Sequence, residues 1–479
     1  MIGMKVSQKN MVDLAERYFQ LKQALRNASA TIKKLSHRRE GRSSPQKGYL
    51  EFFFSAAKDG DVAAPNIMIA AIMETSVLCK NMATLSEILI TNRISIFWEN
   101  HTNIRNEVFV LTWTNSLVNR YTPAMKNFTH NSLPARVVFG KGSIASLGEE
   151  IDRLNAKRAL FCCTPGREKE VSSLIAPLDN ISAGLCPIAE QYVPLPMVEK
   201  GRQIAKEKEA DCVVSYGGGT SVGLAKAIAL EVEIPVISAV TTFSGSETTD
   251  LQAILTDGHR VGYKSDWMLP RTIIYDPETA MGVPLSIMIP SGINAIAHGV
   301  ESFYAQGATP VNSLIAGEGI GALASALKRM SSGQDDVEAR GDGLYGAWLC
   351  GTSLGSAGVA LHHKFAHVLG STFGLEHSMA HTVALPHSVA YTTAGAREAM
   401  QGIATALGDS SKEAATALYE LNVAIGAPTS LRDIGMPEEG IEKAAKMISE
   451  DPYPNPVPVE YAAIRAMIED AWHGRPPTV

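Results

Sequence analysis

The chain has 479 residues, of which 45% are hydrophobic and 19% are charged, a composition typical of a globular protein with more than one domain. No run of about 18 residues is apolar throughout, and no basic start leads into an apolar segment with a cleavage site. We therefore expect no membrane span and no secretory signal. The six cysteines form no CxxC pair and are typical of buried, reduced thiols in a cytoplasmic protein.

Charge is divided unevenly along the chain. Residues 1–128 carry 17 Lys and Arg against 10 Asp and Glu, whereas the remainder carries 26 against 39. The acidic remainder argues against nucleic acid as a partner. Residues 1–128 show no recognisable chemistry, and we predict an extension of unassigned structure there. Its early acidic residues, Asp13 and Glu16, weaken an interpretation as a transit peptide.

From residue 133 onward, short apolar runs alternate with helical ones. The runs "ARVVFG", "RALFCCT", "DCVVSYGGG", "IPVISAVTT" and "RTIIYDPE" predict strands, and helices are expected at "SIASLGEEIDRL", near 196–209 and from Val222. This alternation predicts a parallel sheet with helices on both faces. From about residue 286 the chain is rich in Ala and Gly with helical periodicity. We predict an α/β domain over 129–285, followed by an all-helical domain over 286–479.

A glycine-rich turn joins one predicted strand to the next helix. Glycines allow the backbone to approach a ligand closely, and the N-terminus of a helix favours phosphate. The usual dinucleotide motif GxGxxG is absent, however, so a tight turn without a ligand stays possible. A second loop, "AVTTFSGSETTD", follows the next strand. The lysine of the helix could reach a ribose or phosphate, or could be a solvated surface residue. The candidate cofactor-binding residues are Gly217, Gly218, Gly219, Thr220, Ser221, Lys226, Thr241, Thr242 and Ser244.

The segment "GVALHHKFAHVLGSTFGLEH" holds four of the 12 histidines, namely His362, His363, His367 and His377. Asn294 and His298 are four residues apart, as are His363 and His367, so each pair shares one helix face. These residues could converge in a helical bundle. Three alternatives stay open: a site for zinc or iron, a set of proton donors and anion ligands, or ordinary buried residues. An Asn oxygen is a weaker metal ligand than a carboxylate.

The ordered motifs resemble the iron-containing (group III) alcohol dehydrogenase superfamily from about residue 133 to about 472. They are "RVVFGKGSIASLGEEI", the glycine turn, "TTFSGSE", "YDPE", "SGINAIAHGVES" and the final histidine segment. The resemblance implies a dinucleotide-binding α/β domain followed by a helical domain, as in dehydroquinate synthase. It also implies a divalent metal held by an Asp and three His. The matching positions are Asn294, His298, His363 and His377, and His367 falls where the family keeps a His beside the nicotinamide.

Two departures from the alcohol dehydrogenases look like the maleylacetate reductase branch of that superfamily. Asn294 replaces the metal-binding Asp, and Gly223 replaces an Asp after the glycine turn. In addition, Thr164 stands at the end of "RALFCCTPG", where an acidic residue would bind the ribose and exclude a 2′-phosphate. The resemblance therefore implies a cytoplasmic, homodimeric reductase that uses NADH or NADPH. Its implied reaction is the conversion of maleylacetate, a small dicarboxylate, to 3-oxoadipate in aromatic compound degradation.

Reduction of a C=C bond conjugated to a ketone spreads charge into an enolate, which imidazoles can stabilise, so we expect that no metal is required. In this hypothesis His363 and His367 polarise or protonate the substrate. His298, His377 and Asn294 then help to orient it. One alternative is an iron- or zinc-dependent, NAD(P)-linked alcohol dehydrogenase in which Asn294 is a tolerated ligand. Others are a lyase similar to dehydroquinate synthase, which consumes no net NADH, and a nucleotide-binding protein without turnover.

Overall fold

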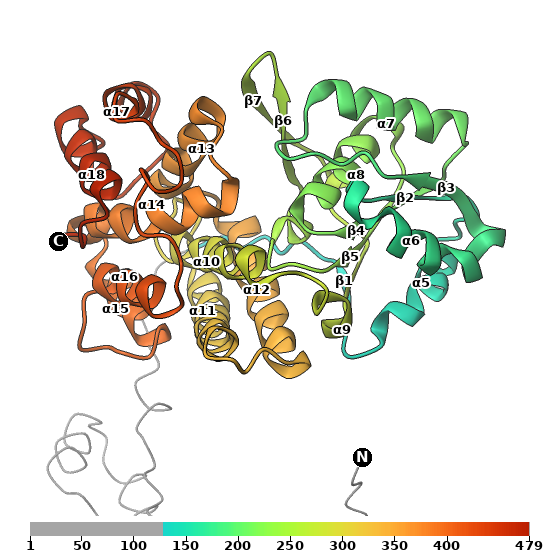
Figure 1. Ribbon diagram of the computed structural model, residues 1–479, viewed down its shortest axis with the longest axis horizontal. Coiled ribbons are helices and arrows are strands. Elements are labelled where there is room, and N and C mark those ends of the chain that lie inside the picture. The colour runs from blue at the N-terminus through green and yellow to red at the C-terminus, as the bar shows by residue number, and fades with distance from the viewer. Residues whose placement is uncertain (1–127, 479) are drawn as a thin grey trace, which may run out of the picture. The chain divides into compact units, whose positions relative to one another are not determined.

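The computed structural model describes residues 128–478, which lie within one compact unit. The predicted extension over residues 1–128 lies outside the described residues, apart from Phe128, and so does Cys79. The other five cysteines are buried free thiols, as predicted. Strands and short helices come first in the chain, and a group of longer helices follows (Figure 1). None of the helices within 128–478 is both long and apolar enough to span a bilayer.

Six parallel strands form the main sheet, in the spatial order β1-β8-β5-β4-β2-β3. Five of them are the strands that the apolar runs predict, and β3 is additional. Because all six strands are parallel, their carboxyl ends meet at one edge of the sheet. The strands are β1 (Arg136–Phe139), β2 (Ala159–Cys162), β3 (Ser182–Cys186), β4 (Cys212–Gly217), β5 (Val236–Val240) and β8 (Thr272–Tyr275).

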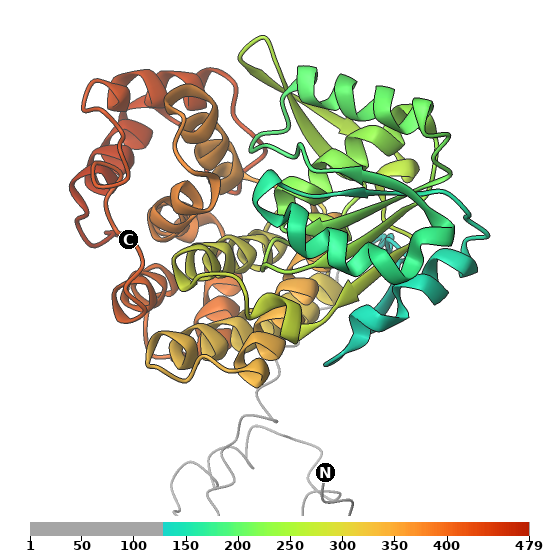
Figure 2. The same ribbon diagram turned by 45° about the vertical axis from the view of Figure 1, so that its right-hand side comes forward.

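Helices cover both faces of this sheet, as predicted (Figure 2). Along β2, Leu160 and Cys162 belong to one buried cluster, with side chains of α7 and α8. Phe161 belongs to a second cluster, with side chains of α5 and α6. Alternate strand residues are thus buried on opposite faces, which explains why the strands are almost continuously apolar. These helices are α5 (Leu147–Arg153), α6 (Glu168–Ile175), α7 (Leu195–Glu207) and α8 (Gly219–Val232).

An antiparallel hairpin, β6 (Leu251–Thr256) and β7 (His259–Lys264), lies outside the main sheet and was not expected from the sequence. It is attached to the loop before α7, where the Leu255 amide donates to the Val193 carbonyl at 3.1 Å. Five short 3-10 helices complete the α/β part. They are η2 (Ser143–Ser146), η3 (Pro165–Arg167), η4 (Ala176–Ile181), η5 (Ser246–Thr248) and η6 (Asp266–Met268).

The described residues after β8 form helices and no strand, in agreement with the predicted all-helical part. Small residues let these helices pack closely: a Cβ on Gly346 would lie 2.7 Å from the Gly319 carbonyl oxygen. This explains the richness in Ala and Gly. The elements are α9 (Pro277–Ala280), α10 (Leu285–Ser302), α11 (Pro310–Ser331), α12 (Val337–Ala357), α13 (Leu361–Phe373), α14 (His377–Thr392), η7 (Thr393–Gly395), α15 (Arg397–Ala406), α16 (Ala414–Ala424), α17 (Gly440–Glu450) and α18 (Tyr461–His473).

Candidate active site

The loops after β4 and β5 meet at the carboxyl edge of the sheet. A Cβ on Gly218 would lie 2.6 Å from Thr242 Oγ1, and one on Gly219 would lie 3.0 Å from Ser244 Oγ. Gly217 has φ +135°, a backbone conformation that favours glycine. The glycines therefore let the two loops pack together. The N-terminus of α8 has no side-chain cap, so its amide groups suit an anion such as phosphate.

Lys226 is fully buried on α8. Its Nζ donates to the Ser246 carbonyl at 2.9 Å and lies 3.1 Å from Thr249 Oγ1. Of the two alternatives for this lysine, the solvated surface residue is therefore wrong, because the ammonium group is buried and holds the loop that follows β5. Burial lowers the pKa of Lys226 to about 7, against the opposing charges of Glu247 and Asp250. Ser221 is also buried, and its Oγ has no partner among the described residues.

Thr164 lies directly beyond β2, where an acidic residue would bind a ribose hydroxyl. Arg167, three residues later, donates from Nη2 to Thr241 Oγ1 at 3.2 Å. Its guanidinium lies 5.7 Å above the Tyr216 ring and pairs with Glu170. The sequence interpretation named Thr164 and Thr241 but missed Arg167. An arginine this close to the end of β2 was the available signal.

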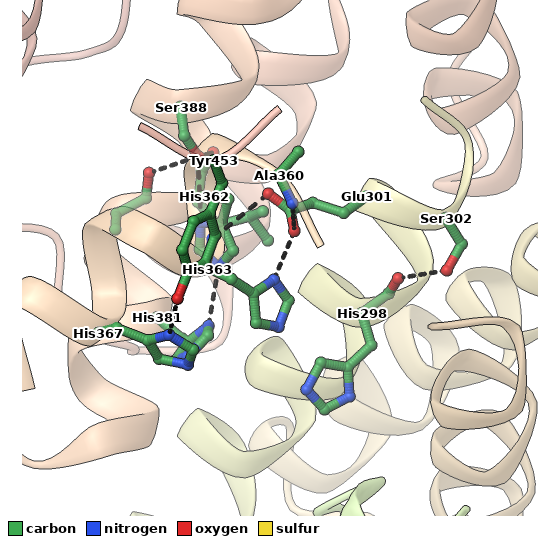
Figure 3. A network of polar contacts seen from close by, with 12 residues as sticks. His298, Glu301, Ser302, Ala360, His362, His363, His367, His381, Ser388 and Tyr453 are labelled. Atoms are coloured by element: carbon green, nitrogen blue, oxygen red, sulfur yellow. Dashed lines mark hydrogen bonds and ion pairs between the residues drawn. The ribbon is translucent and has the colours of Figure 1, made fainter. Parts of the chain in front are cut away.

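The structure brings the predicted histidines together, and Figure 3 shows His298, His363 and His367 among them. His298 comes from α10, His363 and His367 from α13, and His377 is the first residue of α14. The ring centroids of His298 and His363 are 5.4 Å apart, those of His363 and His367 5.9 Å, and those of His367 and His377 6.3 Å. Three helices thus contribute to one histidine cluster.

His381 belongs to the same cluster, although the sequence interpretation did not name it. Its ring centroid lies 4.5 Å from that of His377 and 5.0 Å from that of His363. The four-residue spacing from His377 places both rings on one face of α14, so the signal was present in the sequence.

Glu301 orients His363 and was also missed. This fully buried carboxylate lies on α10, three residues after His298. Its Oε2 is 2.6 Å from His363 Nδ1 and accepts from the Ala360 amide at 2.7 Å. Because a carboxylate only accepts hydrogen bonds, Nδ1 of His363 carries the proton. Nε2, the other nitrogen of this ring, is buried without a partner among the described residues.

A second chain of hydrogen bonds orients His381. Ser388 Oγ lies 3.0 Å from the Ala384 and Leu385 carbonyls, to which it donates, so it accepts from His362 Nδ1 at 3.1 Å. Nε2 of His362 is then the acceptor for Nδ1 of His381, 2.8 Å away. It follows that Nε2 of His381 keeps its lone pair, again buried and without a described partner.

Within the histidine cluster, burial opposes protonation of several rings. Burial, followed by the charges of the neighbouring histidines, lowers the pKa of His298, His362 and His381 well below its ordinary value. For His367 and His377, burial again comes first, and the charge of Arg260 comes second. The pKa of His377 falls to about 3 and that of His367 falls far below normal. A bound anion would counteract the effects of burial and of the Arg260 charge on these two histidines, and would favour their protonated forms.

The four positions that match the family's metal ligands share one property. Each carries a buried polar atom without a described partner: Asn294 Oδ1, His298 Nδ1, His363 Nε2 and His377 Nδ1. However, within residues 128–478 no three His, Cys, Asp or Glu side chains converge closely enough to hold a metal ion. The amide of Asn294 also makes a contact of its own, from Nδ2 to the Ser244 carbonyl at 3.4 Å. As arranged, these residues do not fit a metal, and no step below depends on one.

Known families and structures resemble the chain across this whole region. The model for iron-containing alcohol dehydrogenase matches residues 134–277, and that for the C-terminal part of the Fe-containing alcohol dehydrogenase family matches residues 288–472. A maleylacetate reductase of Burkholderia cepacia is 44% identical over 74% of this chain and 100% of its own length. Crystal structures of maleylacetate reductase from Rhizobium sp. and Agrobacterium tumefaciens superpose with TM-scores of 0.70 each. They are 38% and 37% identical, and each comparison covers 74% of this chain and 100% of the other. The predicted resemblance is confirmed, and the chain belongs to the iron-containing alcohol dehydrogenase family, as an oxidoreductase similar to its maleylacetate reductases.

Proposed function

We propose that the protein reduces the conjugated C=C bond of maleylacetate with NADH or NADPH and releases 3-oxoadipate. The observation that carries this proposal is the histidine cluster, together with Asn294, an uncharged amide at the position where the family's metal ligand is an Asp. The similarity to maleylacetate reductases over the whole length of those enzymes supports it.

The chemistry matches a site without a fixed negative charge next to the reacting bond. A nicotinamide bound at the loops after β4 and β5 would supply a hydride to the alkene carbon that is β to the ketone. The electron pair of the C=C bond moves into an enolate, and the α-carbon then takes a proton. One NAD(P)H and one proton are consumed for each NAD(P)⁺ and 3-oxoadipate formed. Delocalisation over the enolate lowers the demand for a Lewis acid, and imidazole donors can stabilise the developing charge.

We assign the proton-handling roles to His363 and His367, with His298, His377 and Asn294 orienting the substrate. His363 can donate from Nε2 only after this atom gains a proton, because Glu301 holds the other proton on Nδ1. The two negative charges of the substrate favour protonation of nearby imidazoles. Glu301 then stabilises the resulting imidazolium, as a carboxylate does behind a catalytic histidine.

We place the cofactor on the loops after β2, β4 and β5. The phosphates would lie at Gly217–Gly219 and the N-terminus of α8, with Thr220, Ser221, Thr241, Thr242 and Ser244 nearby. Lys226 would act by holding the loop at Ser246. Thr164 leaves room for a 2′-phosphate, and the Arg167 guanidinium could pair with one, which supports use of NADPH as well as NADH.

We also propose that the α/β domain spans 129–285 and the helical domain 286–479, and that the enzyme is a cytoplasmic homodimer. The last strand ends at Tyr275 and α10 begins at Leu285, which supports this division.

The test is oxidation of NADH and of NADPH by the purified protein with freshly prepared maleylacetate, with the product identified by mass spectrometry. The expected result is one 3-oxoadipate formed for each cofactor oxidised. Oxidation of simple alcohols without any turnover of maleylacetate would instead support a metal-dependent alcohol dehydrogenase. This function is the second candidate because Asn294, His298, His363 and His377 each carry a buried donor atom without a described partner.

A further inference from the structure

Arg260, on β7, is the one arginine among residues 128–478 with guanidinium nitrogens that are both shielded and unpartnered. Its Nε and Nη1 are enclosed by protein and have no hydrogen-bond partner among the described residues. Burial lowers the pKa of this arginine from its ordinary value. An enclosed charge without hydrogen bonds is costly, so such a group is typical of a place that a ligand completes.

The surroundings of Arg260 contain aromatic rings in place of a carboxylate. Its guanidinium lies 5.6 Å above the Tyr192 ring. Within the described residues, the groups that affect the pKa of Arg260 are the phenols of Tyr192 and Tyr453, and no carboxylate is among them. Tyr453 also lies beside the histidine cluster, with its Oη 3.4 Å from His367 Nδ1. Uncharged aromatic rings can hold a guanidinium in place without neutralising its charge, so the charge stays available to an anion.

Arg260 is held next to the histidine cluster. The Tyr192 ring, over which its guanidinium lies, contacts the segment just before His377. In agreement with this position, the positive charge of Arg260 contributes to lowering the pKa of both His367 and His377. The Tyr192 hydroxyl donates to the Leu375 carbonyl, two residues before His377. Tyr192 has φ +64° and Val193 has φ +53°, a left-handed conformation that such residues rarely adopt. Backbone strain of this kind clusters at functional sites.

We propose that Arg260 forms a carboxylate subsite that binds one end of the dicarboxylate substrate and orients it against the histidine cluster. A carboxylate here would supply the missing hydrogen-bond acceptors of the guanidinium. It would also favour the protonated forms of His367 and His377. This inference deepens the proposed function, since it rests on a substrate with two carboxylates. The subsite would add a residue from the hairpin β6–β7 to a site otherwise built by helices.

The shared chemistry of the ligand is an oxyanion, which could come from the substrate carboxylate or from a phosphate of the cofactor. The experiment separates the two sources with steady-state kinetics of Arg260→Gln and Arg260→Lys, in which KM is measured for maleylacetate and for NADH. Arg271→Gln is the matched control, because the Arg271 guanidinium likewise stacks on an aromatic ring, 6.0 Å above Trp267, at an exposed position.

A second measurement does not depend on turnover. Calorimetry in the presence of NAD⁺ compares binding of adipate with that of hexanoate, which has the same chain length and lacks one carboxylate. Thermal melting of each variant shows whether it is folded. If Arg260→Gln does not fold, Arg260→Lys carries the test, since a lysine keeps the charge but cannot reproduce the planar guanidinium.

We expect Arg260→Gln to raise the KM for maleylacetate by about 10- to 100-fold and to abolish the preference for adipate, with the KM for NADH nearly unchanged. Arg260→Lys should recover part of the loss, and Arg271→Gln should behave as wild type. An unchanged KM for maleylacetate would overturn the subsite, and so would an increase confined to NADH, which would assign Arg260 to the cofactor phosphate. If the wild type bound adipate through Arg260 yet never reduced maleylacetate, the proposed function would fail while the subsite stood.

Discussion

The loops at the edge of the sheet and the histidine cluster would offer opposite kinds of groups to a ligand. Around Gly217–Gly219, the missing side chains let two loops pack together beside the uncapped N-terminus of α8, and the buried cation Lys226 is used by the protein itself. In the histidine cluster, side-chain atoms such as His363 Nε2 and Asn294 Oδ1 are buried without described partners. Substitutions in the loops should therefore weaken cofactor binding by small amounts. Substitutions in the cluster should act on the chemical step or on substrate binding.

The largest expected effect comes from Glu301→Gln. The glutamine keeps the size of the side chain but can present an N–H group to His363 Nδ1, which would move the ring proton to Nε2. We expect kcat to fall by about 100-fold, with the KM for NADH unchanged, because the partner that sets the tautomer of a functional histidine typically contributes this much. Steady-state kinetics beside the exposed control Glu318→Gln tests this, and a kcat within two-fold of wild type for Glu301→Gln would refute it.

Asn294→Asp tests whether the cluster avoids negative charge. The aspartate loses the donor to the Ser244 carbonyl and places a carboxylate near the dianionic substrate. We expect the KM for maleylacetate to rise by about 10-fold in metal-free buffer, while the KM for NADH stays the same. Unchanged or tighter substrate binding would show that the amide has no such role.

Lys226→Met tests the loop side of the comparison. Methionine fills a similar volume but removes the hydrogen bonds to Ser246 and Thr249, so the loop after β5 should lose its position. We expect the KM for NADH to rise by about five-fold, with kcat nearly unchanged. Lys206→Met, at an exposed position of α7, is the control. A large fall in kcat without a change in the KM for NADH would contradict the distinction between the two regions.

The smallest effect concerns stability against pH. Burial lowers the pKa of His387 to about 4, whereas an unfolded histidine titrates near its ordinary value of about 6.5. Below that value the unfolded chain takes up a proton that the native protein does not, so stability is lost as pH falls from about 6.5 toward 4. Between pH 6.5 and 5.5, wild type should lose about 1 kcal/mol more unfolding free energy than His387→Gln. Urea denaturation measures this, and equal losses would mean that His387 takes up a proton in the native state as readily as in the unfolded chain.

Much of the fold is predictable from the sequence because each buried strand is a short, almost continuous apolar run. The strand "RALFCCT" and the helix near 196–209 correspond to β2 and α7. The helix expected from Val222 begins earlier, at Gly219, because glycine and hydroxyl residues hide a helix start. Strand β3, "SAGLC", is too short and too rich in small residues to stand out. The hairpin β6–β7 lies mostly at the surface, so its residues lack the apolar signal of a buried strand.

The candidate site was predictable to the extent that its residues share helix faces. Asn294 with His298, and His363 with His367, follow from a spacing of four. Glu301 and His381 lie at helical spacings from His298 and His377, yet nothing in the sequence shows that they make hydrogen bonds. The role of Arg260 could not be predicted from the sequence. This residue lies on a surface hairpin, and its contact with the Tyr192 ring brings it to the histidine cluster.

The most direct test of the central claim is maleylacetate-dependent NADH oxidation, measured with and without a strong metal chelator. We predict that turnover persists in the chelator at the same rate, because imidazoles that the bound dianion helps to protonate provide the proton transfer and charge stabilisation. Turnover that is abolished by the chelator and restored by a single metal, iron or zinc, would contradict the account. It would show that Asn294, His298, His363 and His377 rearrange to complete a metal site.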